Sequence, residues 1–229
     1  MPVRMLVQTF RAYVGLGLFL AMGISPVQAK EGVEARSAIT VSVYDDARVG
    51  LEGLQQMEQI SSEVFSRVGI EIRWQNCGVN GELTHVSDEC GQARFPEMLQ
   101  LRFLQKPRDL NPGTFGISYL NAGGEGCYSQ VFVEPIEQLR QQFPIGLSTL
   151  LGYVATHELA HLLLGTNSHT AFGIMRARWG PKELESANMG GLRFYEEQRE
   201  RMATRVAAGI RHNQQMLAAT ASRCNVAAD

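Results

Sequence analysis

The chain has 229 residues, a formal net charge of −2 and 45% hydrophobic residues. This length supports one domain with a substantial core, and the composition is ordinary for a soluble globular protein. Because the net charge is slightly negative and no block of like charge is present, the sequence argues against nucleic-acid binding.

The first 29 residues differ from the rest of the chain. Two arginines precede an uncharged apolar run at 12–24, and Val27 and Ala29 occupy the small-residue positions before a cleavage site. This layout is typical of a secretory signal peptide, and the apolar run is short for a membrane span. We therefore expect a signal peptide at 1–29, a folded domain at 30–229, and an exported protein, periplasmic or secreted, without stable membrane insertion.

The first half of this domain alternates between strand and helix patterns. Alternating apolar residues predict a strand at 37–45. An apolar residue every three to four positions then predicts an amphipathic helix at 50–69, and alternation resumes in a strand at 70–74. Segments rich in turn formers separate three further strand candidates: 98–104, 114–120 and 129–135.

The second half is predicted to be helical. Residues 145–164 form the most apolar helix after the first 29 residues, and Gly165 ends it. After a loop that contains Trp179 and Pro181, a long helix spans roughly 192–219. The order of elements indicates a single α/β domain in which a sheet carries helices.

Helix 145–164 carries a His-Glu-x-x-His motif at His157, Glu158 and His161. An α-helix turns every 3.6 residues, so the two histidines lie on one face, about 6 Å apart along the axis, within reach of one zinc ion. Glu158 would sit beside the metal and take a proton from a zinc-bound water. The motif therefore predicts metal-assisted hydrolysis of a peptide bond.

The third zinc ligand is harder to assign. Gly165 follows His161 by four residues, and His169 follows Gly165 by four. A helix continuing to His169 would carry it about 12 Å past His161, so the chain must reverse. Four residues can span about 13 Å, which is enough to return. We favour His169 as the ligand, with Glu183 or Glu185 as the rivals.

Residues 157–175, HELAHLLLGTNSH followed by GIM, resemble the metzincin clan of zinc endopeptidases, in particular small secreted bacterial members. The resemblance extends over roughly 37–220. It implies a zincin-like α+β catalytic domain with a mixed twisted sheet, a backing helix, an active-site helix, a methionine turn and a long C-terminal helix. The chain departs from the usual pattern by one extra residue on each side of Gly165.

The resemblance also implies roles for individual residues. His157 and His161 match zinc ligands, Glu158 matches the general base, and Met175 matches the methionine beneath the metal. One catalytic zinc ion and a peptide or protein substrate follow from these roles. The substrate would bind as an extended strand beside a sheet edge, for which residues 114–124 are the candidate.

Other residues with suitable chemistry are less well placed. His85 lies in a polar loop and His212 on the exposed side of the last helix, so we predict that neither is a ligand. Four tyrosines could donate a hydrogen bond to an oxyanion, and the sequence does not choose among them: Tyr119, Tyr128, Tyr153 and Tyr195.

Four cysteines follow the first 29 residues, and export to an oxidising compartment favours disulfides. Three pairings are possible. We predict Cys77–Cys90, which closes a short polar loop, and Cys127–Cys224, which would tie the C-terminal segment to the domain. A zinc site made of cysteines is the rival, but no C-x-x-C spacing supports it.

The sequence thus predicts a secreted zinc-dependent endopeptidase. The alternative is a zinc-containing binding or structural protein on the same scaffold with little or no hydrolytic activity. Glu158 and a site with three protein ligands favour the enzyme, because structural zinc sites are more often closed by four. The oligomeric state is left open.

Overall fold

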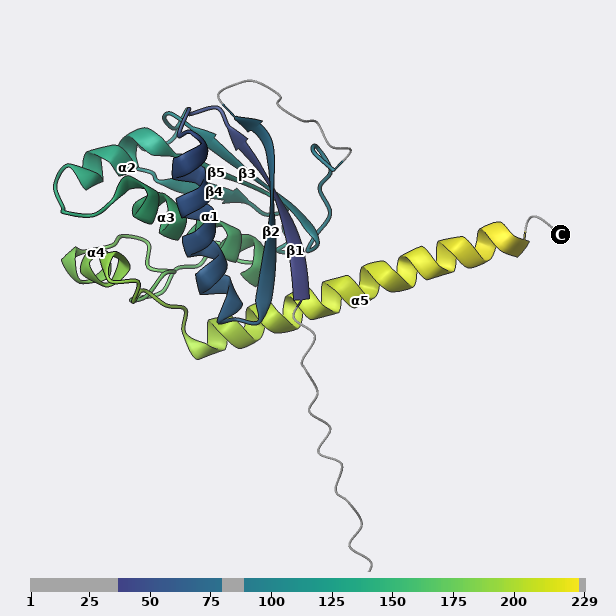
Figure 1. The fold of residues 1–229 in the computed structure, drawn as a ribbon. Coiled ribbons are helices and arrows are strands. Elements are labelled where there is room, and N and C mark those ends of the chain that lie inside the picture. The colour runs from purple at the N-terminus through teal and green to yellow at the C-terminus, as the bar shows by residue number, and fades with distance from the viewer. Residues whose placement is uncertain (1–36, 80–88, 227–229) are drawn as a thin grey trace, which may run out of the picture. The chain divides into compact units, whose positions relative to one another are not determined.

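The computed structural model describes residues 37–79 and 89–226, and its strands form one five-stranded sheet (Figure 1). The strand order is β2-β1-β3-β5-β4. β1, β2, β3 and β5 run parallel, and β4 pairs antiparallel with β5 at one edge. The strands are β1 Ser37–Asp45, β2 Ile70–Val79, β3 Met98–Leu104, β4 Gly116–Tyr119 and β5 Tyr128–Phe132. This sheet and its helices confirm the predicted α/β class.

Two sequence predictions fall outside the described residues: the signal peptide at 1–29 and the placement of His85. In the last helix, side chains are described as far as Ala219. No helix within the described parts is both long enough and apolar enough to cross a membrane.

Asp45 shapes the turn from β1 into α1 (Leu51–Ser66). Its buried carboxylate accepts hydrogen bonds of 2.9 Å from the backbone N–H groups of Val49 and Gly50. α1 then returns the chain to the start of β2, so that β2 can pair parallel with β1. The predicted order of strand, helix and strand is confirmed.

α1 packs against α3 (Leu147–Leu164), and both helices contact the sheet (Figure 1). Every residue of α3 from Leu150 to Leu164 is buried. Gly152 lets the two helices approach closely, because an added Cβ would lie 2.9 Å from the Cβ atom of Ile60. The inward residues of β1 are also buried: Ile39, Val41 and Val43.

The predicted strand at 129–135 is wrong in its second half. β5 ends at Phe132, and α2 (Val133–Arg140) begins at the next residue. Pro135 lies in the first turn of α2, where its missing N–H costs no hydrogen bond. Val133, Pro135 and Ile136 are buried, so an apolar run of this kind does not distinguish the end of a strand from the start of a helix.

The last helix, α5 (Glu196–Val226), starts later and ends later than the predicted span of 192–219. Leu192 and Phe194 are buried in the loop before it rather than in the helix. α5 contacts α3 and β1, but almost all of its side chains from 211 to 219 are exposed.

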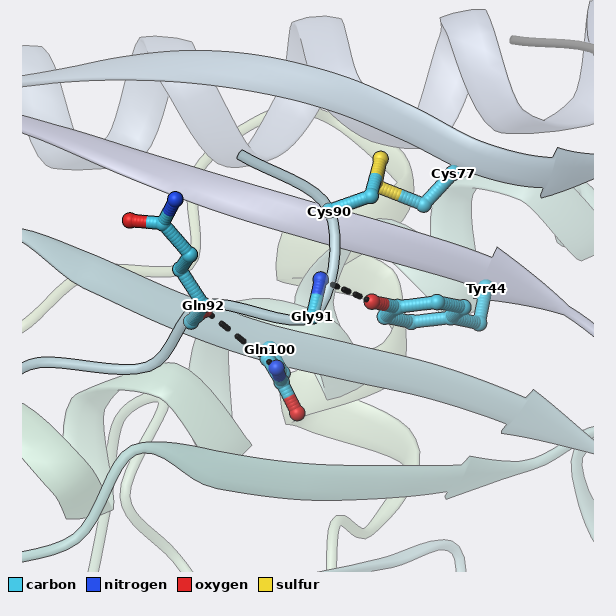
Figure 2. The surroundings of a disulfide bond; sticks show 6 residues. All are labelled: Tyr44, Cys77, Cys90, Gly91, Gln92 and Gln100. Carbon is cyan, nitrogen blue, oxygen red and sulfur yellow. Dashed lines mark hydrogen bonds between the residues drawn. A yellow bond between two sulfur atoms is a disulfide. The ribbon is translucent and has the colours of Figure 1, made fainter. Parts of the chain in front are cut away.

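The disulfide Cys77–Cys90 is present, as predicted, with its Cα atoms 5.6 Å apart. It fastens the segment after Cys90 to the end of β2. The backbone N–H of Gly91 donates a 2.8 Å hydrogen bond to the hydroxyl of Tyr44 in β1, which holds the same segment against the sheet (Figure 2).

The second predicted disulfide is wrong, because Cys127 is a free thiol. Cys127 lies in a groove that Arg205 and Gly209 of α5 also line. Cys224 follows Gly209 in the same unbroken helix, about 22 Å further along at 1.5 Å per residue. The continuous helix therefore carries Cys224 away from Cys127.

Candidate metal centre

α3 places three polar side chains of the motif inside the protein. His157, Glu158 and His161 are 8%, 5% and 4% exposed. Buried groups of this kind are costly unless other groups satisfy them. The groups that contact these three side chains therefore determine their protonation and the chemistry of the site.

The side chains of His157, His161 and His169 converge. Their possible ligand atoms all lie within 4.8 Å of one another. The Nε2 atoms of His157 and His161 are 3.0 Å apart. The ring centroid of His169 lies 5.2 Å from that of His157 and 4.9 Å from that of His161. Within the described residues, these three form the group that could hold a metal ion.

Backbone carbonyl groups fix the tautomers of two of these rings. His157 Nδ1 lies 2.7 Å from the oxygen of Ile174, and His161 Nδ1 lies 2.7 Å from the oxygen of Thr166. A carbonyl oxygen only accepts, so each Nδ1 carries the proton and each Nε2 presents a lone pair. A cation shared by lone pairs 3.0 Å apart would stabilise this arrangement. The donor set fits a metal such as zinc.

Burial keeps the histidines neutral. Burial first, and the neighbouring His161 ring second, lower the pKa of His157 to about 3. Burial lowers the pKa of His161 to about 4, against the hydrogen bond to Thr166, which raises it. His169 is exposed by comparison, and partial desolvation lowers its pKa in the same direction. Neutral imidazole is the form that binds a metal ion, so the site is prepared for one at neutral pH.

Gly165 makes the return of the third histidine possible. It ends α3 in the left-handed conformation, with φ of 67°, and its N–H donates to the His161 oxygen at 2.9 Å. An added Cβ would lie 2.8 Å from the backbone oxygen of Gly124, which together with the positive φ favours glycine here. Arg205 donates to the backbone oxygens of Leu163 and Gly124, at 3.1 and 3.0 Å. The chain reverses here, as predicted.

Met175 lies in the turn that follows the third histidine. It is fully buried, and its carbonyl oxygen accepts a 2.8 Å hydrogen bond from the N–H of Thr170. The preceding carbonyl, of Ile174, accepts from His157 and also from the indole N–H of Trp179, at 3.2 Å. The turn thus orients one of the three histidines.

Glu158 points toward β4 and β5. The hydroxyl of Ser118 lies 2.7 Å from Glu158 Oε2. Burial raises the pKa of Glu158 to about 8, and the hydrogen bond from Ser118 opposes that rise. Gly116 passes so close to this carboxyl group that an added Cβ would lie 2.5 Å from its Oε1. A glycine and a serine on β4 therefore make room for Glu158 and bind it.

A cleft of about 560 Å³ opens beside these residues. His157, Glu158 and His169 line it, together with residues 113–116 and 176–179. Leu139 of α2 and Val154 of α3 supply further apolar wall. A buried carboxyl group and two of the three histidines thus face a space that can hold part of a ligand.

The rival ligands lie elsewhere. Glu183 is in α4 (Pro181–Asn188), where it accepts hydrogen bonds from Arg176 and from the N–H of Gly180, at 2.6 and 2.9 Å. Glu185 is exposed on the same helix. Both lie outside the group of described residues that could hold a metal ion, which consists of the three histidines.

The remaining candidates also lie away from the three histidines. His212 is exposed on α5 and lines a different groove. Tyr119 and Tyr128 stack on each other with ring centroids 5.4 Å apart. Tyr153 is buried with its ring edge-on to that of Trp179, and Tyr195 is exposed beside Gly173. None of the four tyrosines lines the described cleft.

Sequence reasoning missed Ser118 and Arg176. Gly116 and Ser118 are small residues two positions apart, so they share one face of a strand. That pairing signals the close approach of another element, although it does not identify α3. Nothing in the sequence pairs Arg176 with Glu183, because a loop precedes α4.

The sequence matches no protein-family model, and no curated protein matches it. Solved structures that resemble it include a zinc-dependent peptidase from Methanocorpusculum labreanum, with 14% identity over 71% of this chain and 99% of the other. Archaemetzincin from Methanopyrus kandleri has 14% identity over 76% and 99%. Metalloproteinase-II from Bacteroides fragilis has 11% identity over 74% of this chain and 53% of its own. Each TM-score is 0.46.

Proposed function

We propose that this protein is a zinc-dependent endopeptidase. His157, His161 and His169 would hold one zinc ion, and Glu158 would act as the general base. One observation carries the proposal: three converging histidines lie next to a buried carboxyl group at the wall of an open cleft. Three protein ligands leave a further coordination position for water or substrate, as in catalytic zinc sites.

A zinc ion in such a site lowers the pKa of a bound water to near 7 and polarises a carbonyl group. Glu158 would take the proton of the attacking water and later deliver it to the departing amine. Ser118 holds one oxygen of this carboxyl group and leaves the other for proton transfer. Ile174 and Thr166 hold the rings of His157 and His161 in the tautomer that binds metal.

The substrate would bind as an extended strand along β4. β4 is the edge of the sheet, so one side of its backbone has no partner strand among the residues that the structure describes. Its first residue, Gly116, lines the cleft and touches Glu158. A peptide that adds to this edge would pass over the three histidines. This placement supports the edge expected from residues 114–124.

We also propose that Met175 underlies the metal and that the protein is exported. The buried turn beside Ile174 supports the first proposal. The sequence layout of residues 1–29 supports the second, together with the Cys77–Cys90 disulfide, a bond typical of oxidising compartments.

A random peptide library tests the activity. Zinc-loaded protein is expected to cut internal peptide bonds, and the Glu158→Gln variant is expected to bind zinc but to cut at least 1,000-fold more slowly, roughly the loss expected of a missing general base. If the wild-type protein binds zinc and cuts no peptide that the variant spares, the alternative of a zinc-containing binding or structural protein replaces the enzyme.

A further inference from the structure

Among the described residues, the cleft beside the three histidines is lined by two arginines and by one acidic side chain. Arg176 and Arg178, from the segment after Met175, both line it. The one acidic side chain in its described lining is Glu158, next to the histidines. The protein as a whole carries a slightly negative net charge, so this concentration of positive charge is local to the cleft.

Arg176 is held in place. Its Nη1 atom lies 2.6 Å from Oε2 of Glu183, whose side chain is nearly buried. The same carboxylate oxygen accepts a 2.9 Å hydrogen bond from the N–H of Gly180, which fixes it further. One carboxylate contact leaves most of the five N–H donors of a guanidinium group for other partners. Arg176 is thus oriented, and it still has donors to offer.

Arg178 is the charge without a counter-ion. Its side chain is exposed at the cleft, and among the described residues it has no hydrogen-bonded or ion-paired partner. A guanidinium group binds a carboxylate through two parallel hydrogen bonds, which gives both strength and orientation. Arg178 can therefore take a carboxylate from outside the chain.

The rest of the cleft suits an aliphatic stem. Phe115 just before β4, Leu139, Val154 and Trp179 supply apolar surface to its lining. These apolar residues and the two arginines line the same cleft, so one ligand side chain can contact both kinds of group. Glutamate combines an aliphatic stem with a terminal carboxylate.

We propose that this cleft selects an acidic substrate side chain, such as glutamate, at a position next to the bond that is cut. Arg178 is the residue that determines this specificity, and Arg176 supports it. This inference rests on the proposed peptidase function and adds its substrate class. It predicts a protease for acidic sequences, although the protein itself is slightly acidic.

The test compares matched peptides. Starting from a peptide identified in the library, the residue on each side of the cut is replaced in turn by Glu, Gln, Leu or Lys. Zinc-loaded wild-type protein is expected to cut the best Glu peptide about tenfold faster in kcat/KM than its Gln counterpart, and the preference should shrink at high salt. In the Arg178→Gln variant, the ratio of kcat/KM between the Glu and Gln peptides should fall close to one. The Arg178→Glu variant should cut the Lys peptide fastest.

A second readout does not depend on catalysis. The zinc-loaded Glu158→Gln variant is titrated with the same Glu and Gln peptides by calorimetry, with and without the Arg178→Gln change. The Glu peptide is expected to bind several-fold more tightly than the Gln peptide, and only when Arg178 is present. Arg211→Gln removes the same charge from the exposed part of α5, and it should leave both ratios unchanged.

The outcomes separate the two proposals. A protein that cuts peptides but prefers Leu or Lys beside the cut, or whose Glu preference survives Arg178→Gln, overturns the acidic specificity and leaves the peptidase standing. A protein that binds Glu peptides through Arg178 but cuts none overturns the peptidase. Equal binding of Glu and Gln peptides contradicts the specificity whatever the activity.

Discussion

Ser118 Oγ lies 2.7 Å from Glu158 Oε2 and joins the edge strand to the buried carboxyl group of α3. The same hydroxyl lies 2.7 Å from the backbone oxygen of Glu158 and 3.0 Å from Ser129 Oγ. A hydroxyl group has one proton to donate. With Glu158 ionised, donation to Oε2 is favoured, because hydrogen bonds to charged acceptors are the stronger ones. Ser129 can then donate to Ser118.

Replacement of Ser118 by alanine should therefore impair catalysis more than folding. Glu158 would lose the contact that orients its carboxyl group, and we expect kcat to fall about 10- to 100-fold with KM little changed. The measurement is steady-state kinetics on a library-derived peptide over a range of pH. Loss of this hydrogen bond should raise the pKa of Glu158 and so move the acidic limb of the pH–rate profile to higher pH.

Ser61→Ala is the matched control for that variant. Ser61 is also buried and also contacts α3, through a 3.1 Å hydrogen bond from Thr156. Its removal should destabilise the protein by a similar amount, about 1 kcal/mol, without the loss of kcat. Equal losses of kcat in both variants would show that Ser118 has only a structural role.

Gly116→Ala should displace Glu158. The added Cβ would lie 2.5 Å from Oε1 of that carboxyl group, well inside van der Waals contact. We expect loss of nearly all activity with zinc still bound. Gly113→Ala is the control, because its Cβ would meet only Asn111 Oδ1 at an ordinary 3.5 Å. If the Gly116→Ala variant keeps its activity, the tight placement of Glu158 against β4 is wrong.

Glu158→Gln should stabilise the metal-free protein. Burial raises the folded-state pKa of this carboxyl group to about 8, from an ordinary 4.5. The stability that the neutral acid contributes is therefore complete below pH 4.5 and is lost as the pH rises through 8. Glutamine does not ionise, so its advantage should grow by up to about 1.4 kcal/mol per pH unit across this window.

Chemical denaturation of metal-free protein at several pH values measures this difference in the free energy of unfolding. Glu185→Gln, at an exposed position of α4, serves as the control and should show no such growth. If the free energies of unfolding of wild type and Glu158→Gln differ by a constant amount from pH 5 to 8, the carboxyl group is solvated in solution.

His169→Ala should weaken zinc binding by at least about 100-fold, because it removes one of three ligands. His212→Ala should leave zinc affinity unchanged, since His212 is exposed on α5. Glu183→Gln should also retain zinc, although it loses the ion pair with Arg176. Competition with a chromophoric chelator measures all three. Normal zinc affinity in His169→Ala, or its loss in Glu183→Gln, would exclude the three-histidine site.

Local patterns predicted the elements that position the site. Alternation identified the strands at 37–45 and 98–104 at their observed bounds. The apolar run before Gly165 identified α3. The length of the segment after Gly165 showed that His169 can lie beside His157 and His161. These features depend on residues close together in the chain, where periodicity, glycine and chain length decide the outcome.

Contacts between distant segments could not be predicted in this way. The contact between Ser118 and Glu158 exists because the edge strand crosses α3, which no sequence period records. The pairing of Cys127 with Cys224 was wrong because α5 continues without a break. Pro135 was assigned to a strand because an apolar run is ambiguous until tertiary packing settles it.

If the three histidines and Glu158 form one catalytic zinc site, zinc binding and peptide hydrolysis must rise together. Metal-free protein is titrated with zinc, and peptide hydrolysis is followed at each step. Hydrolysis is expected to rise with zinc and to saturate at one equivalent in the wild-type protein. Glu158→Gln should bind the same single equivalent without hydrolysis. Stoichiometric zinc binding without hydrolysis in the wild type, or equal hydrolysis by both proteins, would show that these residues do not form a catalytic zinc site.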